Sequence, residues 1–375
     1  MKKKDKIPPC EFKPVSQKPV FPRRKTRHIK IGPVAIGGGA PIAVQSMTKT
    51  DTRDVKATLA QIERMEQAGC EIVRLAIPDK QAVEALGKIR KRVALPLVAD
   101  IHFDHRLALA SLAKGVDGLR INPGNIGSQA KVREVVKAAK DREIPIRIGV
   151  NSGSLEKTLL KKYGGATPEA MVESALRQVK NLEDLDFYHL KISLKASDVF
   201  RTVRAYQLMA QEVDYPFHAG ITEAGGFFSG TVKSAVGLTL LLKEGLADTI
   251  RVSLTAPPED EVRAAYKILS SLGLRSHGLD FISCPVCGRA EVDIFEIASD
   301  IEKRLSSVRE NIKVAVMGCM VNGPGEAKEA DIGLACGRGK GVIFKQGKLF
   351  RHLEEEDKIA SEFVKEVTRF AKSLD

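Results

Sequence analysis

One pattern recurs eight times between residues 29 and about 272: a short run rich in β-branched residues, then polar or glycine-rich residues, then a stretch with helical periodicity. Helices between strands make the strands parallel, and eight such units favour a closed (β/α)8 barrel of the TIM type. An open doubly wound sheet is the alternative, because periodicity alone does not close a barrel. The expected strands are Ala43–Met47, Ile72–Ile77, Leu97–Phe103, Gly118–Asn122, Pro145–Val150, His189–Ser193, Phe217–Thr222 and Thr249–Leu254.

The segments between these strands carry helix-start signals. Asp54 precedes the amphipathic stretch Val55–Gln67 as a candidate N-cap. Thr167 does the same for Pro168–Leu182, which has a proline in its first turn. These signals indicate which polar residues belong to the loops that follow the strands.

The polar residues that end the eight runs indicate the chemistry. In a barrel the carboxyl ends of all strands meet at one mouth, where enzymes of this fold have their active sites. Five cations against few acids favour a multiply charged anion, because an arginine fork matches phosphate oxygens and buried cations without an anion are costly. A single arginine is about as often a structural ion-pair partner. The expected mouth residues are Arg53, Asp100, His102, Arg120, Asn122, Arg147, Asn151, Lys195, Glu223 and Arg251.

Two of these residues are candidates for proton transfer. Glu223, which ends the segment HAGITE, is the best-placed acid for general acid–base work, and His102 is a candidate for a polar or proton-handling role. Glycine-rich segments at 123–125 and 149–153 offer backbone N–H donors to an anion. Neither segment is a Walker or dinucleotide-binding motif, so no nucleotide cofactor is indicated.

The net charge of +13 is concentrated at the N-terminus, where residues 1–30 hold eleven Lys and Arg against two acids. Such a tail with prolines is typical of a solvated arm, and 5% aromatic residues without tryptophan leave little for base stacking. We expect no nucleic-acid partner, although a basic-tailed RNA-binding protein is an alternative. No apolar run could span a bilayer and no apolar segment follows the basic start, so we expect no membrane association and a cytoplasmic location.

Past residue 280 the pattern changes to an α+β module of about 95 residues that contains clustered cysteines. Cys284 and Cys287 form a Cys-x2-Cys turn, and Cys319 follows 32 residues later within GCMVNGPGE. Clustered thiols in a cytosolic chain indicate metal or redox chemistry before a disulfide. A structural zinc would take Cys336 as its fourth ligand, whereas a 4Fe–4S cluster could take an oxygen of Glu326. The spacing leaves both open, so a reductase and a pterin-type barrel transferase with a structural zinc knuckle are both possible functions.

Eight segments together carry a close resemblance to one enzyme family: VQSMTKTDTRD, ADIHF, RINPGN, RIGVNSGSL, KISLKASD, HAGITEAG, SCPVCGR and GCMVNGPGE. The chain resembles 4-hydroxy-3-methylbut-2-enyl diphosphate synthase of the methylerythritol phosphate isoprenoid pathway, in its short bacterial form, from about Arg27 to the C-terminus. The resemblance implies a barrel followed by an iron–sulfur domain similar to those of sulfite and nitrite reductases. It also implies that flavodoxin or ferredoxin supplies two electrons, and that 2-C-methyl-D-erythritol 2,4-cyclodiphosphate is opened and dehydrated to (E)-4-hydroxy-3-methylbut-2-enyl diphosphate.

The resemblance assigns roles to individual residues. It implies a 4Fe–4S cluster held by Cys284, Cys287, Cys319 and Glu326, so that Cys336 becomes a bystander. It makes Glu223 and Glu326 the catalytic residues, with Glu223 as the proton donor. The substrate contacts that it implies are Arg53, Arg120, Arg147, Asn151, Lys195, Arg251, Ser253 and Asn322.

The domain boundaries have a geometric consequence. We expect a basic flexible tail over residues 1–26, a substrate-binding barrel over 27–273, a linker over 274–280 and a cluster domain over 281–375. The last barrel helix runs antiparallel to the strands, so the chain leaves the barrel opposite the mouth. About nine linker residues reach at most ~30 Å, which leaves no slack to fold over the barrel edge. We therefore expect a head-to-tail homodimer whose active sites are shared between subunits, in line with the family.

Overall fold

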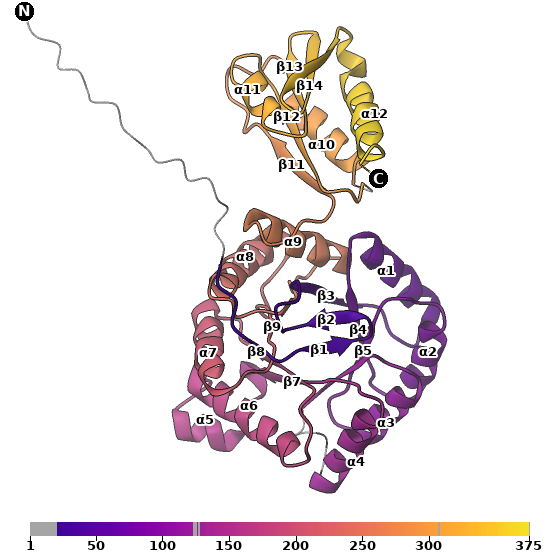
Figure 1. The fold of residues 1–375 in the computed structure, drawn as a ribbon, viewed down its shortest axis with the longest axis vertical. Coiled ribbons are helices and arrows are strands. Elements are labelled where there is room, and N and C mark those ends of the chain that lie inside the picture. The colour runs from indigo at the N-terminus through magenta and orange to yellow at the C-terminus, as the bar shows by residue number, and fades with distance from the viewer. Residues whose placement is uncertain (1–20, 123–125, 127, 307, 375) are drawn as a thin grey trace, which may run out of the picture.

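The computed structural model describes residues 21–122, 126, 128–306 and 308–374, and it contains a large barrel with a smaller domain beside it (Figure 1). The barrel strands are β3 Ala43–Met47, β4 Ile72–Ala76, β5 Leu97–Asp100, β6 Gly118–Ile121, β7 Ile146–Asn151, β8 Leu190–Lys195, β9 His218–Ala219 and β10 Thr249–Ile250. They pair in parallel in the order β8-β7-β6-β5-β4-β3-β10-β9, and a parallel bridge between Ile192 and Phe217 links β8 to the segment of β9. The ring of strands confirms the barrel prediction, and the open-sheet alternative is wrong.

Helices cover the outside of this ring (Figure 1). All eight predicted strands begin within one residue of the observed start, because β-branched runs mark strand starts well. Asp54 and Thr167 are N-caps as predicted, accepting the backbone N–H groups of Ala57 at 3.0 Å and Ala170 at 3.2 Å. The helices are α1 Val55–Gln67, α2 Lys80–Arg90, α3 His105–Ala113, α4 Gln129–Lys140, α5 Lys157–Tyr163, α6 Pro168–Glu183, α7 Val199–Glu212, α8 Phe227–Lys243 and α9 Pro258–Ser271, with a short 3-10 turn at Ser152–Ser154.

A hairpin made of β1 (Ile29–Ile31) and β2 (Val34–Ile36) covers the amino end of the barrel, in front of the strands in Figure 1. Its buried isoleucines pack against Ile72 and Val98, which belong to barrel strands. This hairpin closes the end of the barrel that is opposite the mouth.

The segment before the hairpin is bound to the barrel as well. Arg23 forms an ion pair with Asp248 at 3.0 Å, and Arg24 donates hydrogen bonds to the carbonyl oxygens of Val213 and Tyr215. These acceptors at the barrel end bind the guanidinium groups of Arg23 and Arg24, and the flexible tail over residues 1–26 stays a prediction. Residues 1–20 lie outside the described part of the chain, and so does Cys10.

The smaller domain is a five-stranded sheet with helices on both faces. Its strand order is β11-β12-β13-β14-β15, parallel from β11 to β13 and antiparallel after that. The strands β14 and β15 are joined by a hairpin turn at Gln346 and Gly347, and both residues have positive φ. The elements are β11 Leu279–Ser283, α10 Ile294–Arg304, β12 Ile312–Met317, α11 Gly323–Lys328, β13 Ile332–Gly337, β14 Lys340–Lys345, β15 Lys348–Leu353, a 3-10 turn at Glu356–Lys358 and α12 Ile359–Ala371.

The linker between the two parts is fastened to the amino end of the barrel. Arg275 forms an ion pair with Glu71 at 2.8 Å and donates to the carbonyl oxygen of Ile42 at 2.6 Å. Ile42 and Glu71 directly precede β3 and β4, so both mark the amino ends of barrel strands. His277 lies against the ring of Tyr266, with 4.9 Å between ring centroids. The chain therefore leaves the barrel at the end opposite the mouth.

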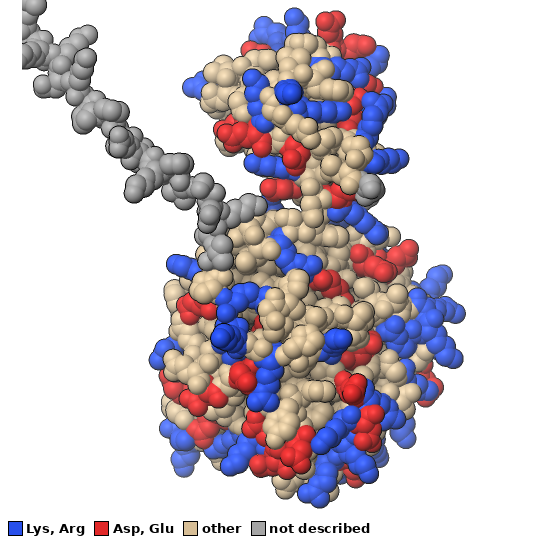
Figure 2. Space-filling view, in the orientation of Figure 1, with Lys and Arg blue, Asp and Glu red and all other residues tan. Residues whose placement is uncertain are grey.

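The surface carries mixed charge. On the face shown in Figure 2, Lys and Arg side chains are interspersed with Asp and Glu over both domains. The arginines closest to the tail are bonded to the barrel, so part of the positive charge at the N-terminus is used within the fold. None of the helices described here is both long and apolar enough to cross a membrane. The cytoplasmic location stays a prediction.

Candidate active site and cluster site

Six cationic side chains gather inside the barrel, and each is buried or nearly so. Among the residues that the structure describes, only the carboxylates of Asp100 and Glu261 form ion pairs with any of them. The interior therefore holds a large excess of positive charge, which favours an anionic ligand. The six are Arg74 on β4, Arg120 on β6, Arg147 on β7, Lys191 and Lys195 on β8, and Arg251 immediately after β10.

Asp100 is shared by two of these arginines. Its Oδ1 lies 3.1 Å from Nη1 of Arg120, and its Oδ2 lies 3.4 Å from Nε of Arg74. Burial alone would raise the pKa of Asp100, but Arg74 and Arg120 hold it below the usual value. The carboxylate therefore stays charged and fixes the two guanidinium groups relative to each other.

Glu261, on α9, does the same for the other side of the mouth. It lies 3.2 Å from Nε of Arg251 and 2.9 Å from Nζ of Lys49, and it accepts the hydroxyl of Ser46 at 2.7 Å. Burial would raise the pKa of Glu261, but Arg251 and the N–H of Leu254 lower it. Glu261 therefore positions Arg251 before any ligand binds.

Arg147 forms none of these ion pairs. Its Nε and Nη1 are buried and have no hydrogen-bond partner among the described residues. Burial lowers the pKa of Arg147 well below its usual value, and the neighbouring Arg74 and Arg120 lower it further. A bound anion would supply both the missing acceptors and the missing negative charge.

Lys195 is paired with a histidine instead of an acid. Its Nζ lies 3.3 Å from Nε2 of His218, whose Nδ1 lies 2.8 Å from Oγ1 of Thr249. Burial lowers the pKa of Lys195 well below its usual value, and Arg147 adds to that effect. Burial and then Lys195 lower the pKa of His218 well below its usual value, so the ring is neutral.

Two glycines make room for these cations. A Cβ at Gly149, on β7, would lie 2.9 Å from Nε of Arg120, and a Cβ at Gly220 would lie 2.9 Å from Nζ of Lys195. Any larger residue at either position would displace a cationic side chain. The glycines therefore belong to the architecture of the mouth.

Sequence reasoning missed Arg74, Lys191, Lys49 and Glu261. The signal for Arg74 was present, because it alternates with Val73 and Leu75, both fully buried in the core outside the strand ring. A charged residue between two core residues of a barrel strand faces the barrel interior. Glu261 gave no such signal, since its contact with Arg251 depends on how α9 packs against the barrel.

The structure brings Arg120, Arg147, Lys195 and Arg251 together, as predicted, but it places Arg53 apart from them. Arg53 is about half exposed and forms ion pairs with Asp51 at 2.6 Å and Asp79 at 3.2 Å. Its loop follows β3 at the mouth, so it lies on the rim and not inside the barrel.

The other predicted mouth residues lie at the ends of their strands. Asn151 ends β7, Ser253 follows β10, and both are partly buried. Asn122 is buried just after β6 and has an interaction partner, while residues 123–125 lie outside the described part of the chain. His102 lies 3.6 Å from Asp100 and is about half exposed.

Glu223 is exposed at the mouth and has a left-handed backbone conformation with φ of 53°. Such a conformation costs a non-glycine residue about 1–3 kcal/mol and is found where the surrounding structure requires it. The βα loop between β9 and α8 therefore fixes the direction in which this carboxylate leaves the backbone.

The three candidate ligand cysteines lie at one end of the small sheet. Cys284 directly follows β11, and Cys319 follows β12, the parallel neighbour of β11. The backbone N–H of Gly318 lies 3.4 Å from Sγ of Cys284, which joins the two loops. Cys287 is exposed in the loop that begins at Cys284. Parallel strands therefore bring two distant parts of the sequence to the same site.

The sulfur atoms have surroundings suited to thiolates. Sγ of Cys319 accepts backbone N–H groups of Asn322, Val321 and Gly323, which lower the pKa of this thiol. Glu326 is exposed in the first turns of α11, close to this loop in sequence. No three His, Cys, Asp or Glu side chains of the described residues converge tightly enough to hold a single metal ion. Three cysteine thiols on neighbouring loops are a donor set that zinc sites and iron–sulfur clusters both use.

Cys336 lies inside β13 and is fully buried. It shares the strand face of Ile332 and Leu334, which packs in the core with α12. The alternating residues Gly333 and Ala335 contact α11, the helix that carries Glu326, on the opposite face. Cys336 therefore packs as a core residue, as does Cys70, whose thiol has its pKa raised to about 12 by burial.

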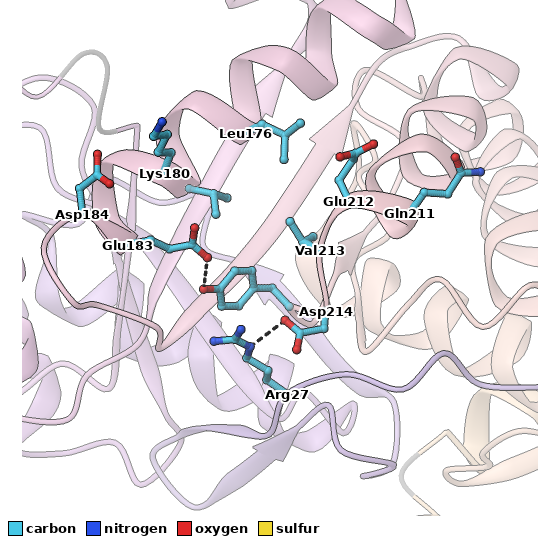
Figure 3. Close-up of a pocket in the computed structure, with 11 residues that line it drawn as sticks. Arg27, Leu176, Lys180, Glu183, Asp184, Gln211, Glu212, Val213 and Asp214 are labelled. Carbon is cyan, nitrogen blue, oxygen red and sulfur yellow. Dashed lines mark hydrogen bonds and ion pairs between the residues drawn. The ribbon is translucent and has the colours of Figure 1, made fainter.

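Two cavities lie outside the mouth. One, of about 670 Å³, opens between α6 and α7 and is lined by charged side chains (Figure 3). There Arg27 pairs with Asp214 at 2.7 Å, and the hydroxyl of Tyr215 donates to Glu183 at 2.6 Å. Because these residues lie at the amino end of the barrel, the groove has a structural role. The other, of about 700 Å³, separates α9 from the small domain.

Comparison with known proteins identifies the family. The GcpE TIM-barrel domain matches residues 26–266, and the GcpE protein C-terminal domain matches residues 280–369. The chain belongs to the GcpE family. This result confirms the resemblance found in the sequence, and it sets aside the pterin-type transferase.

Curated members of the GcpE family are similar to this chain along almost its whole length. The protein named 4-hydroxy-3-methylbut-2-en-1-yl diphosphate synthase (flavodoxin) from Geobacter sulfurreducens is 57% identical over 92% of this chain and 98% of its own length. The protein of the same name from Thermodesulfovibrio yellowstonii is 58% identical over 89% of this chain and 96% of its own length. The prediction that this chain is an enzyme of this class is confirmed.

Proposed function

We propose that this GcpE-family chain reduces 2-C-methyl-D-erythritol 2,4-cyclodiphosphate to (E)-4-hydroxy-3-methylbut-2-enyl diphosphate. The reaction consumes two electrons and two protons, opens the cyclic diphosphate at carbon and releases one water. Flavodoxin is the proposed electron donor, because it stands in the names of the relatives. The observation that carries the proposal is the excess of buried cations in the mouth, which fits a diphosphate.

The barrel half of the proposed site binds and orients the diphosphate. Arg147 has two donors without partners, and Arg120 and Arg251 are fixed by Asp100 and Glu261. Preorganised donors of this kind stabilise the negative charge that develops on a leaving oxygen without reorganisation during the reaction. Lys195, Asn151 and Ser253 complete the proposed substrate contacts of the barrel, and Arg53 would contact the ligand from the rim. Asn322, the N-cap of α11, would contact it from the cluster half.

The cluster half would be held by Cys284, Cys287, Cys319 and Glu326. When bound, a 4Fe–4S cluster supplies the two electrons one at a time. Glu326 would add an oxygen ligand, which binds iron more weakly than the three thiolates would. Glu223 is the proposed proton donor, and its constrained backbone keeps the carboxylate at the mouth.

We further propose that each active site combines the barrel of one subunit with the cluster domain of the other. Arg275 fastens the linker to the amino end of the barrel, opposite the mouth. The strand β11 leads away from that linker, and Cys284 follows its last residue, about 16 Å further on at ~3.3 Å per residue. In Figure 1, β11 begins on the barrel side of the small domain and runs away from the barrel, so Cys284, which directly follows β11, lies at a distance from its own barrel.

Mixing two inactive variants tests the shared site. Lys195→Met removes a barrel contact, and Cys319→Ser removes a cluster ligand, so each pure dimer should be inactive under anaerobic conditions with the cyclodiphosphate and an artificial reductant. After subunit exchange, a heterodimer with a shared site has one intact mouth facing one intact cluster, and activity should return. No recovery in a mixture shown to contain heterodimer would refute the sharing of sites between subunits.

The role of Glu326 has its own test. Glu326→Ala should keep most of the iron and sulfide but lose most of the turnover, whereas the nearby exposed Glu329→Ala should be normal in both. A protein that contains one zinc and no sulfide after anaerobic purification would refute the reductase proposal as a whole.

A further inference from the structure

The sulfur atom of Met47, at the end of β3, contacts two of the arginines that gather inside the barrel. Nη2 and Nε of Arg74 lie 2.9 and 3.1 Å from Sδ of Met47, and Nη1 of Arg251 lies 3.7 Å from it. The strand β3 lies between β4, which carries Arg74, and β10, which Arg251 directly follows. The order of the strands therefore puts one thioether between two guanidinium groups.

Met47 faces the inside of the barrel, where its neighbours are charged. Ser46, the residue before it, points toward α9 and donates to Glu261 at 2.7 Å, and successive residues of a strand face opposite sides. Met47 belongs to none of the apolar clusters that the described residues form. Packing of a hydrophobic core therefore does not explain a methionine at this place.

Through this sulfur atom the two acid-anchored parts of the mouth become one connected set. Asp100 lies 3.4 Å from Nε of Arg74, and Glu261 lies 3.2 Å from Nε of Arg251. Because Met47 contacts both arginines, the contacts run from Asp100 to Glu261 without a break. Burial lowers the pKa of Arg74, Asp100 opposes this effect, and the nearby charge of Arg251 adds to it. The two guanidinium groups therefore repel each other, and the sulfur gives them a shared contact.

A neutral acceptor suits this position better than a charged or an apolar side chain. A carboxylate would hold both arginines more strongly, but it would cancel one positive charge of an anion site. A hydrocarbon side chain would accept no hydrogen bond and would leave the two like charges without a common contact. A thioether is a weak acceptor with a polarizable sulfur, so it orients guanidinium groups and leaves their charge intact.

We propose that Met47 is a positioning residue of the diphosphate site: its thioether holds Arg74 and Arg251 in the orientation that binds the ligand, without neutralising them. This inference rests on the proposed function and adds to it a residue that carries no charge. Because the sulfur orients groups that bind substrate and transition state alike, its loss should weaken binding more than it slows the reacting step.

Three substitutions of Met47 separate the effect of the acceptor from the effect of charge. Met47→Leu keeps the size and loses the acceptor, so KM for the cyclodiphosphate should rise about tenfold, the effect of one lost hydrogen bond to a charged group, while kcat changes little. Met47→Gln supplies a neutral amide oxygen and should bring KM back to within about threefold of the wild-type value. Met47→Glu has the same length as Met47→Gln but adds a negative charge, and KM should rise about 100-fold.

Two readouts and a matched control accompany these variants. Each protein is purified anaerobically with its cluster and assayed with a small artificial reductant, while iron, sulfide and thermal unfolding show that it is folded. Calorimetry with inorganic pyrophosphate should rank the four proteins in the same order of affinity as KM does. Met209→Leu makes the same chemical change on α7, in the core outside the strand ring, and should leave KM unchanged.

The outcomes distinguish this inference from the function on which it rests. If Met47→Leu binds both ligands as the wild type does, the sulfur does not position the arginines. If Met47→Gln is no better than Met47→Leu, the methionine acts through packing and the inference is wrong. If Met47→Glu binds as tightly as Met47→Gln, the neutrality of this side chain has no role and the inference is again wrong. If the wild-type holoenzyme neither binds nor turns over the cyclodiphosphate, the proposed function fails, and this inference fails with it.

Discussion

The two halves of the proposed active site are built in opposite ways. The barrel mouth is buried and held by ion pairs, with Asp100 and Glu261 fixing arginines before any ligand is present. The cysteine loops are partly or fully exposed, and their polar order comes from backbone N–H groups around sulfur. The mouth needs its charges in a dry, fixed arrangement, because an anion is recognised by geometry and low dielectric. The cysteine half needs mainly its thiolates and a surface able to reach the mouth.

This difference between the mouth and the cysteine loops shows that stability and function conflict in the mouth. The buried cations destabilise the empty barrel, since burial disfavours their charged forms. Exposed cysteines cost little in stability, and in the proposed function a bound cluster would organise them. Substitution of a buried cation such as Arg147 should therefore lower activity without lowering stability. Substitution of a ligand cysteine should lower the iron content while the protein stays folded.

The largest effect is expected from a pair of cysteine variants. Cys319→Ala should lose iron, sulfide and all turnover while the barrel stays folded. Cys336→Ala should keep the cluster and lose about 1 kcal/mol of unfolding free energy through a small cavity in the core. Iron and sulfide analysis with thermal unfolding checks both. If Cys336→Ala lost its metal, Cys336 would be a metal ligand, as in the zinc site with four cysteines.

A large effect on activity with the opposite effect on stability is expected for Arg147→Met. Loss of a charged donor to the diphosphate should lower kcat/KM by roughly 100- to 1,000-fold, equivalent to about 3–4 kcal/mol. Thermal stability should be unchanged or higher, because methionine removes a poorly compensated buried cation. Exposed Arg263→Met should change neither. A strongly destabilised Arg147→Met protein would show that this side chain has partners in the empty enzyme.

A smaller effect on activity is expected for Glu261→Gln, together with a change in pH dependence. Without the carboxylate, Arg251 and Lys49 lose their counter-charge, so kcat/KM should fall by about tenfold and stability by about 2 kcal/mol. Because the folded pKa of Glu261 is lowered from 4.5, its stabilisation is present above pH 4.5 and is lost as pH falls through the folded pKa. Urea unfolding between pH 3 and 7 should show that the unfolding free energy of the variant decreases less than that of the wild type as the pH falls. If the unfolding free energy of both proteins changed equally with pH, Glu261 would not be the source of this pH dependence.

The smallest expected effect is the uptake of protons when the diphosphate binds near Lys195. Burial and then Arg147 lower the pKa of Lys195 well below its usual value in the protein without ligand, which favours the neutral amine. A bound diphosphate favours the charged ammonium, and binding should therefore take up a fraction of a proton. Calorimetry in buffers of different ionisation enthalpy measures this uptake, and Lys195→Met should reduce it. Buffer-independent heats in the wild-type enzyme would contradict the assignment.

The sequence predicted much of the fold because its signals are local. Runs of β-branched residues and the caps Asp54 and Thr167 fix where elements begin, whatever surrounds them. Arg120, Arg147, Lys195 and Arg251 were predictable as one set, since strand ends of a parallel barrel meet at one place. Arg53 does not join that set, because it forms ion pairs with Asp51 and Asp79. The pattern of strand ends does not predict these ion pairs.

By itself the sequence determined the barrel, the cysteine-bearing domain and the family, because each depends on periodicity or on motifs read in order along the chain. Only the tertiary structure decided which charges face each other. Glu261 meets Arg251 through the packing of α9, Arg23 and Arg24 leave the predicted tail to bind the barrel end, and Arg275 fastens the linker away from the mouth. These contacts join residues far apart in sequence, so no local pattern encodes them.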